Sequence, residues 1–150
     1  MSSLSIFYLN IRSFRKKLDF IKENCLDFDI LCFTETHLTN DIPTDTLKLE
    51  GFNDPYRIDN TAHSGGLLVY ISINLLCKRR PELEHISIQS IWTEIKFKDS
   101  SLILCNIYRP PNTQVQLWDE FYVSIENALD SCSNLIIVGD LNENLLNVNN

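Results

Sequence analysis

Two short segments of this chain are apolar almost without interruption, and they constrain the fold more than any other feature. Residues 30–34 read Ile-Leu-Cys-Phe-Thr, and residues 135–138 read Leu-Ile-Ile-Val. Both have the length of a buried strand, and neither shows the apolar-polar alternation of a strand with one wet face. Strands of this kind are covered on both faces, as in α/β proteins. The two segments therefore predict an α/β fold.

Four further strands are expected from runs of β-branched and aromatic residues: 4–10, 67–73, 86–97 and 102–108. The polar residues 98–101 predict a hairpin between the last two. Proline and glycine among Asn, Asp and Thr make residues 36–64 mostly loop, and Lys-Arg-Arg-Pro at 78–81 predicts a basic turn.

Two segments show the periodicity of amphipathic helices. Their apolar positions are Phe14, Leu18, Ile21 and Cys25, with Ser13 as the N-cap, and then Leu117, Phe121, Ile125 and Leu129. Two helices can cover one face of a sheet, and no other segment evidently covers the second face. We therefore expect mainly one mixed sheet with helices on one face, and a second layer from a partner or from sequence outside these 150 residues.

Composition narrows the class of protein. The five cysteines are an odd number without a Cys-x-x-Cys pair, which predicts reduced thiols in an intracellular protein of the nucleus or cytoplasm. The most apolar segment, 67–77, is too short to cross a membrane. A formal net charge of -7 argues against nucleic-acid binding by overall charge, although it allows local phosphate contacts.

Polar side chains follow three of the expected strands where each one ends. They are Asn10, Glu35, Asp140 and Asn142. If these strand ends lie side by side, two carboxylates and two amides converge at one edge of the sheet. Oxygen ligands of this kind suit Mg²⁺ or Mn²⁺, which can polarise a phosphoryl group. The alternative is that these residues are simply polar where strands leave the core.

Five motifs carry a resemblance that bears on this choice. Asn10 stands in Leu-Asn-Ile-Arg-Ser, Glu35 in Phe-Thr-Glu-Thr-His-Leu, Tyr108 in Asn-Ile-Tyr-Arg-Pro-Pro and Asp140 in Val-Gly-Asp-Leu-Asn, with Ser-Gly-Gly-Leu-Leu-Val-Tyr between the second and third. In order and rough spacing they resemble the endonuclease/exonuclease/phosphatase superfamily, and most of all the apurinic-like endonuclease domain of non-LTR retrotransposons. The resemblance implies part of a four-layer α/β/β/α sandwich of the deoxyribonuclease I type.

The resemblance also implies roles for individual residues. Glu35 would be the principal ligand of Mg²⁺ or Mn²⁺, assisted by Asn10. Tyr108 would bind the scissile phosphate, Asp140 would orient or activate the attacking water, and Asn142 would stabilise the phosphate oxygens. The implied reaction is hydrolysis of a DNA phosphodiester that leaves a nick, in a protein whose intact relatives are joined to a reverse transcriptase.

The arginines Arg12 and Arg109, beside two of the motifs, are the expected contacts to DNA. For the cluster of basic residues that begins at Arg12, a solvated helix face is the competing interpretation.

One segment of the family pattern has no counterpart in residues 1–150. The resemblance implies a later Ser-Asp-His segment that supplies the general base, and His37, His63 and His85 all lack that context. We therefore expect an incomplete domain with little activity alone, weak magnesium binding and self-association through an exposed sheet face. The alternatives are a non-catalytic relic or interaction module, and a phosphoinositide-type phosphatase of the same fold.

Overall fold

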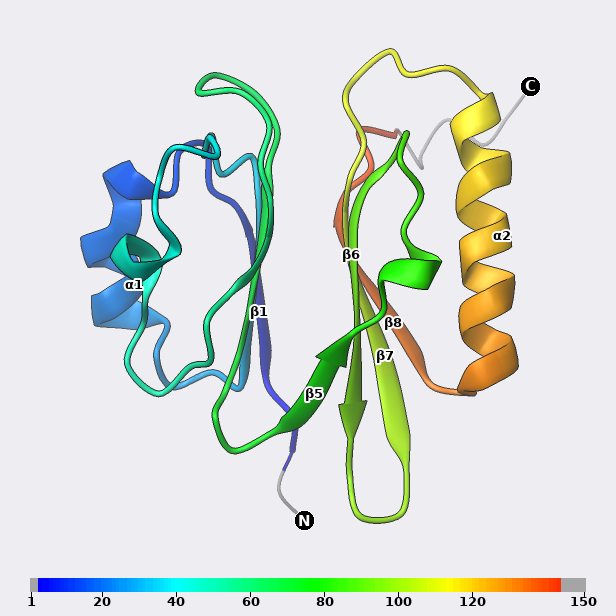
Figure 1. Cartoon of the computed structure of the whole chain (residues 1–150), viewed down its shortest axis with the longest axis horizontal. Helices are drawn as coiled ribbons and strands as arrows, with labels where there is room; N and C mark the ends of the chain where they lie inside the picture. Colours follow the sequence, from blue (N-terminus) through cyan, green and yellow to red (C-terminus); the bar gives the residue numbers. More distant parts are fainter. Residues whose placement is uncertain (1–2, 144–150) are drawn as a thin grey trace.

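The computed structural model describes residues 3–143, and within them the strands form two four-stranded sheets (Figure 1). The first sheet has the order β1-β2-β4-β3, with β1 (Ile6–Asn10), β2 (Ile30–Thr34), β4 (Leu67–Ile71) and β3 (Tyr56–Ile58). The second has the order β5-β6-β7-β8, with β5 (Leu76–Arg79), β6 (Gln89–Lys96), β7 (Ser101–Tyr108) and β8 (Leu135–Asp140). The pairs β1–β2 and β7–β8 are parallel, and the other pairs are antiparallel.

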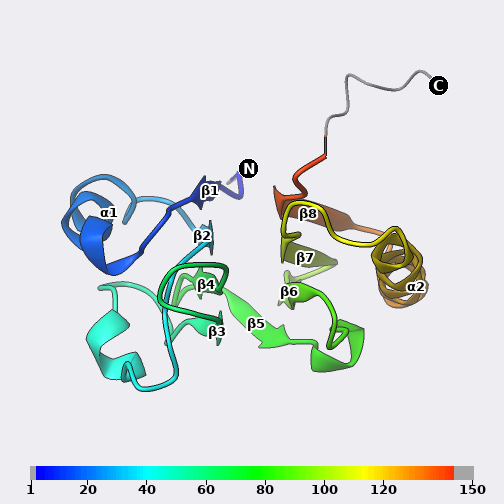
Figure 2. The same ribbon diagram turned by 90° about the horizontal axis from the view of Figure 1, so that it is seen from above.

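The helices lie on the outer faces of the two sheets. A 3-10 turn (Arg15–Lys17) and α1 (Leu18–Asn24) cover the first sheet, and α2 (Gln116–Ser131) covers the second. Short 3-10 turns also occur at Thr44–Leu47 and Pro81–Leu83. Figure 2 shows the resulting order of helix, sheet, sheet and helix from above. The expected α/β/β/α sandwich is therefore confirmed.

Three apolar clusters fill the spaces between these layers. The central cluster lies between the sheets and includes Ile30, Cys32, Val69, Ile91 and Leu104. A second cluster lies under α1 and a third under α2. Alternate residues of β2 point into the central cluster and into the cluster under α1, so all five of its residues are buried. This double burial is the reason why residues 30–34 show no polar alternation.

The expectation of mainly one mixed sheet is wrong. The chain leaves the first sheet after β4, and β5 begins the second sheet, whose inner face packs on that of the first. The face that we expected to be open is therefore covered by strands of this same chain, and self-association through it loses its physical basis. Two strands were also missed, because β3 lies in the predicted loop 36–64 and β5 includes half of the predicted basic turn 78–81.

The expected N-cap is wrong, whereas the expectation for the cysteines is confirmed. Ser13 is not an N-cap, because its φ is +87° and the first helical turn begins two residues later without a side-chain cap. The cysteines are all free thiols, as expected, with Cys25, Cys32 and Cys105 buried. Within residues 3–143 no helix is both long and apolar enough to cross a membrane.

Candidate active site at the rim of the two sheets

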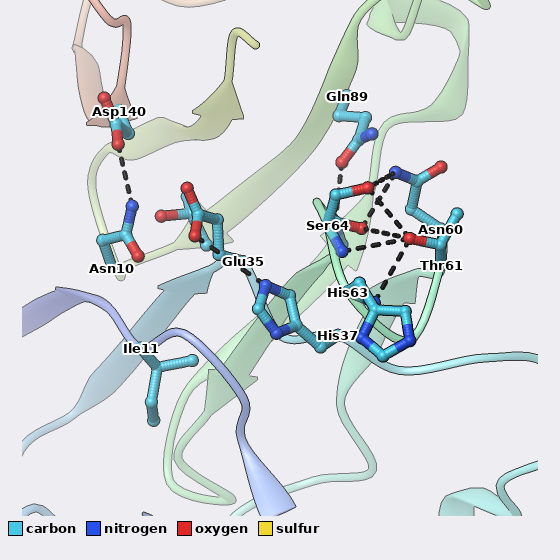
Figure 3. Close-up of polar contacts among 12 residues, drawn as sticks. Asn10, Ile11, Glu35, His37, Asn60, Thr61, His63, Ser64, Gln89 and Asp140 are labelled. Atoms are coloured by element: carbon cyan, nitrogen blue, oxygen red, sulfur yellow. Dashed lines mark hydrogen bonds and ion pairs between the residues drawn. The ribbon is translucent and has the colours of Figure 1, made fainter. Parts of the chain in front are cut away.

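Four strand ends meet at one rim of the sandwich. Asn10 is paired with Thr34, the residue before Glu35, because β1 and β2 run parallel and end together. In the second sheet Tyr108 is paired with Asp140 for the same reason. The two sheets are joined here by a hydrogen bond of 2.8 Å from Asn10 Nδ2 to Asp140 Oδ2 (Figure 3). The polar residues predicted to converge at one edge of a sheet therefore converge at the common edge of two sheets.

Glu35 is held in an unusual backbone conformation just past the end of β2. Its φ is +53°, and Arg12, Ser13 and His37 nearby also have positive φ values. Non-glycine residues rarely adopt this region, and such strain gathers at functional sites. The Glu35 carbonyl accepts a hydrogen bond from Ser13 N at 2.9 Å. The rim loops are thus fixed to one another around a carboxylate that is 21% exposed.

His37 is closer to the rim than we expected. It lies in a loop, as predicted, but its Nε2 is 3.8 Å from a carboxylate oxygen of Glu35, and the side chain is only 16% exposed. The signal for this proximity was the spacing of two residues from Glu35. His63 and His85 are exposed, as expected for surface histidines.

Two tyrosine hydroxyl groups lie near the carboxylates. Burial, followed by the negative charges of Glu35 and Asp140, raises the pKa of Tyr108. Burial and the same two charges also raise the pKa of Tyr8, which shares a hydrogen bond of 2.9 Å with the hydroxyl of Thr34. Tyr8 was not predicted as a site residue. Its signal was the position two residues before Asn10, which places both side chains on one face of β1.

Asp140 is oriented by bonds to both of its carboxylate oxygens. Oδ2 accepts the bond from Asn10, and Oδ1 accepts a bond of 3.0 Å from the backbone N–H of Asn142. The side-chain amide of Asn142 donates to the carbonyl of Arg109 at 2.6 Å. The orientation of the Asp140 carboxylate is therefore fixed from both sides, and one N–H of the Asn142 amide is used by a backbone carbonyl.

Arg109 is placed differently from the DNA contact that we expected. The residue is 7% exposed, and its guanidinium lies 5.2 Å from the ring centre of Trp118. It donates to the carbonyl of Leu141 at 3.1 Å and to the Glu143 carboxylate at 3.0 Å. These contacts fasten the segment after β8 to α2, so the arginine has a structural task. The sequence could not reveal this because its partners are distant along the chain.

Arg12, the other expected contact to DNA, is exposed beside the rim. In the predicted basic turn 78–81, Arg79 pairs with Glu84 at 2.7 Å, and Arg80 pairs with Glu94 at 3.0 Å. Both of these arginines are therefore held in ion pairs within the protein.

The rim fits a hard divalent cation with few protein ligands. Asn10 Oδ1 is buried without a hydrogen-bond partner among the described residues, while Nδ2 of the same side chain is already used. Glu35 follows the strand paired with β1. Within residues 3–143 no cluster of three or more His, Cys, Asp or Glu side chains is arranged to hold a metal. One carboxylate and one amide oxygen match the sparse protein shell of Mg²⁺, which retains water and binds phosphate oxygens.

Comparison with known proteins agrees with this geometry. The model of the Endonuclease/Exonuclease/phosphatase family matches residues 7–147. A search of curated protein sequences found no significant match.

Solved structures share the fold at low sequence identity. The endonuclease domain of TRAS1, a telomere-specific non-LTR retrotransposon, has a TM-score of 0.67 at 11% identity over 96% of this chain and 61% of its own. The human Nocturnin catalytic domain has a TM-score of 0.62 at 16% identity, covering 93% and 65%. The Xenopus laevis APE2 catalytic domain has a TM-score of 0.59 at 19% identity, covering 93% and 59%. The chain thus spans about three-fifths of the length of these structures.

Proposed function

This chain belongs to the endonuclease/exonuclease/phosphatase family, and from that premise we propose that its rim serves metal-dependent hydrolysis of a DNA phosphodiester bond. The observation that carries the proposal is the hydrogen bond between Asn10 and Asp140. This bond joins β1 to β8. β1 is paired with β2, which leads to Glu35, and β8 ends at Asp140 opposite Tyr108 of β7. A cation ligand and a phosphate-binding hydroxyl group are thereby supplied from the two sheets to one place.

The metal ligands in this proposal are Glu35 and the free Asn10 Oδ1. Mg²⁺ or Mn²⁺ held there supplies Lewis acidity toward a phosphoryl oxygen. Tyr108 donates its O–H to a phosphate oxygen. Asp140 orients the attacking water, and Asn142 donates to the phosphate through its amide, one N–H of which is bonded to the Arg109 carbonyl.

DNA is the proposed substrate, with Arg12 as a backbone contact. Two similar structures support a substrate of this class. One is the TRAS1 endonuclease domain, and the other is the 3' phosphatase NExo from Neisseria bound to product DNA hairpin, with a TM-score of 0.60. We further propose that the chain derives from a non-LTR retrotransposon in which such a domain is joined to a reverse transcriptase. The order of the rim motifs and the Tyr-Arg-Pro-Pro sequence support this origin.

The activity of these 150 residues alone should be weak. Their sequence contains no Ser-Asp-His segment, and the histidine nearest the rim, His37, is paired with Glu35. Loss of a positioned general base typically removes about 10² to 10⁴ in rate. Slow nicking is therefore the expected behaviour of the isolated chain.

The test separates cation binding from catalysis. Thermal unfolding is measured with and without Mg²⁺ or Mn²⁺ for the wild type, Glu35→Ala and the control Glu50→Ala, in which an exposed glutamate far along the chain from the rim motifs is removed. At a concentration about five times Kd a bound cation stabilises by about 1 kcal/mol, or about 2 to 4 °C. The wild type and Glu50→Ala should show this shift, and Glu35→Ala should lose it.

Nicking of supercoiled plasmid is followed with the same three proteins. Slow cation-dependent nicking that disappears only in Glu35→Ala supports the proposal. A cation shift that Glu35→Ala leaves intact contradicts the metal assignment and favours a non-catalytic module. Fast nicking by the wild type contradicts the expectation of weak activity while retaining the proposed chemistry.

A further inference from the structure

Asn106 is a buried polar residue in an otherwise largely apolar layer. It lies on β7 between the sheets, on the same face as Leu104 and Tyr108, and it is 0% exposed. Its Nδ2 crosses to the first sheet and donates to the carbonyl of Phe33 at 3.1 Å and to that of Leu68 at 3.3 Å. This side chain therefore connects the second sheet to two strands of the first.

This connection lies close to the strand ends that carry Glu35 and Tyr108. Phe33 and Leu68 are partners in the β2–β4 pairing, and Phe33 precedes Glu35 by two residues. Asn106 precedes Tyr108 by the same two residues. The amide thus joins the strand that presents Glu35 to the strand that presents Tyr108, directly below the rim where the two side chains meet.

Packing alone does not account for an asparagine here. Within residues 3–143 the buried amide oxygen Oδ1 has no hydrogen-bond partner, which is an energetic cost that an apolar side chain would avoid. Replacing buried polar groups by apolar groups is often neutral or stabilising, and buried polar contacts can instead specify one arrangement among several. The two carbonyl contacts fix the spacing and register of the sheets in a way that apolar contacts do not.

We propose that Asn106 is a positioning residue that sets the placement of Tyr108 against Glu35 for the hydrolysis proposed above. This inference rests on the proposed function, but the position of the Tyr108 side chain can be measured without any catalysis. The placement of the Tyr108 ring can be followed by NMR through the signals of its ring carbons.

The experiment compares Asn106→Leu, Asn106→Thr and the control Thr93→Val. Thr93 is also fully buried, lies on the inter-sheet face of β6 between Ile91 and Ile95, and has no hydrogen-bond partner for its hydroxyl group within the described part of the chain. The ring-carbon signal of Tyr108, assigned with Tyr108→Phe, is recorded by NMR at neutral pH, where its chemical shift reports on where the ring lies. Nicking kinetics are measured alongside.

Asn106→Leu should shift the ring-carbon signal of Tyr108, and Asn106→Thr, which keeps a donor, should shift it less. Thr93→Val should leave it unchanged. In nicking, Asn106→Leu should lower kcat by about 10- to 100-fold with little change in KM, as misplaced groups do.

An unchanged Tyr108 ring signal in Asn106→Leu overturns the inference, and so does an equal change in Thr93→Val. If Asn106→Leu does not fold, Asn106→Thr decides on the same signal, with an unchanged chemical shift counting against the inference. If the wild type shows no metal-dependent nicking, the proposed function fails, while the ring signal still decides whether Asn106 places Tyr108.

Discussion

Burial controls the ionisation of several tyrosine side chains. The pKa is raised above its ordinary value for Tyr8, Tyr56, Tyr70 and Tyr108, out of five tyrosines in the chain. Burial is the first cause in each, and for Tyr56 it acts with the Cys77 thiol to raise the pKa to about 12. Their neutral forms are thus favoured by folding.

The first prediction at this scale concerns alkaline pH. A pKa raised by folding contributes stability that is complete below the unfolded value, about 10, and is lost as pH rises through the folded value. We expect the free energy of unfolding to fall steadily above pH ~10. Phenolate absorbance should show fewer ionised tyrosines in the folded protein than in urea at the same pH. Identical titration curves in the two solvents would contradict the assignment.

Single residues differ in how well the sequence predicted them. Asn10, Glu35 and Asp140 were predicted to meet because each follows an apolar run, and strand ends at one edge of a sheet are neighbours. Tyr8 was missed because its charged neighbours arrive from other strands. Arg109 was misjudged because Trp118 and Glu143 occupy its guanidinium, and neither is adjacent in the sequence.

At the scale of elements, β8 depends on a glycine. Gly139 has a φ of +145°, and a Cβ atom there would lie 1.9 Å from the carbonyl oxygen of Ile107 on β7. The contact is with backbone, which cannot move aside without breaking the β7–β8 pairing. Since Asp140 follows directly, the same glycine determines where this carboxylate stands.

Gly139→Ala should therefore cost more than about 2 kcal/mol, the range of a severe backbone clash. The matched control is Gly51→Ala, where φ is +84° but nothing lies within 4 Å of the added Cβ. That variant carries only conformational strain, about 1 kcal/mol. Urea unfolding of both variants measures the difference, and equal losses would show that the close approach of Ile107 has no energetic weight.

Elements were predictable to the extent that their signal was local. The strands β2, β4 and β7 are buried along apolar runs and were expected within a few residues. The run at 135–138 does form β8, but the expectation that it is buried on both faces is wrong, because Ile136 and Ile137 are exposed. By contrast, β3 is three half-buried residues between Pro55 and Asp59, and only its pairing with β4 makes it a strand. The basic residues 78–80 resembled a turn because the acidic partner of Lys78 and Arg80, Glu94, lies on the neighbouring strand β6.

At the scale of the whole molecule, the division into two sheets was not visible in the sequence. Apolar runs show that a strand is buried, but they do not show which strands pair, because pairing is decided by contacts between distant segments. The inner faces of both sheets share one cluster, to which β2 contributes Ile30 and β6 contributes Ile91. Each sheet would expose its apolar inner face to water if the other sheet unfolded. The two sheets should therefore unfold together.

Ile91→Ala tests this dependence, because Ile91 is fully buried in the shared cluster. We expect a loss of about 2 to 5 kcal/mol, as for other buried isoleucines. In a urea series, tryptophan fluorescence reports on the second sheet through Trp92, and amide exchange of peptide 28–36 reports on β2. Both midpoints should fall equally, whereas Ile86→Ala, at a fully exposed position, should move neither. A midpoint that falls for the tryptophan signal alone would mean that the sheets unfold as separate units.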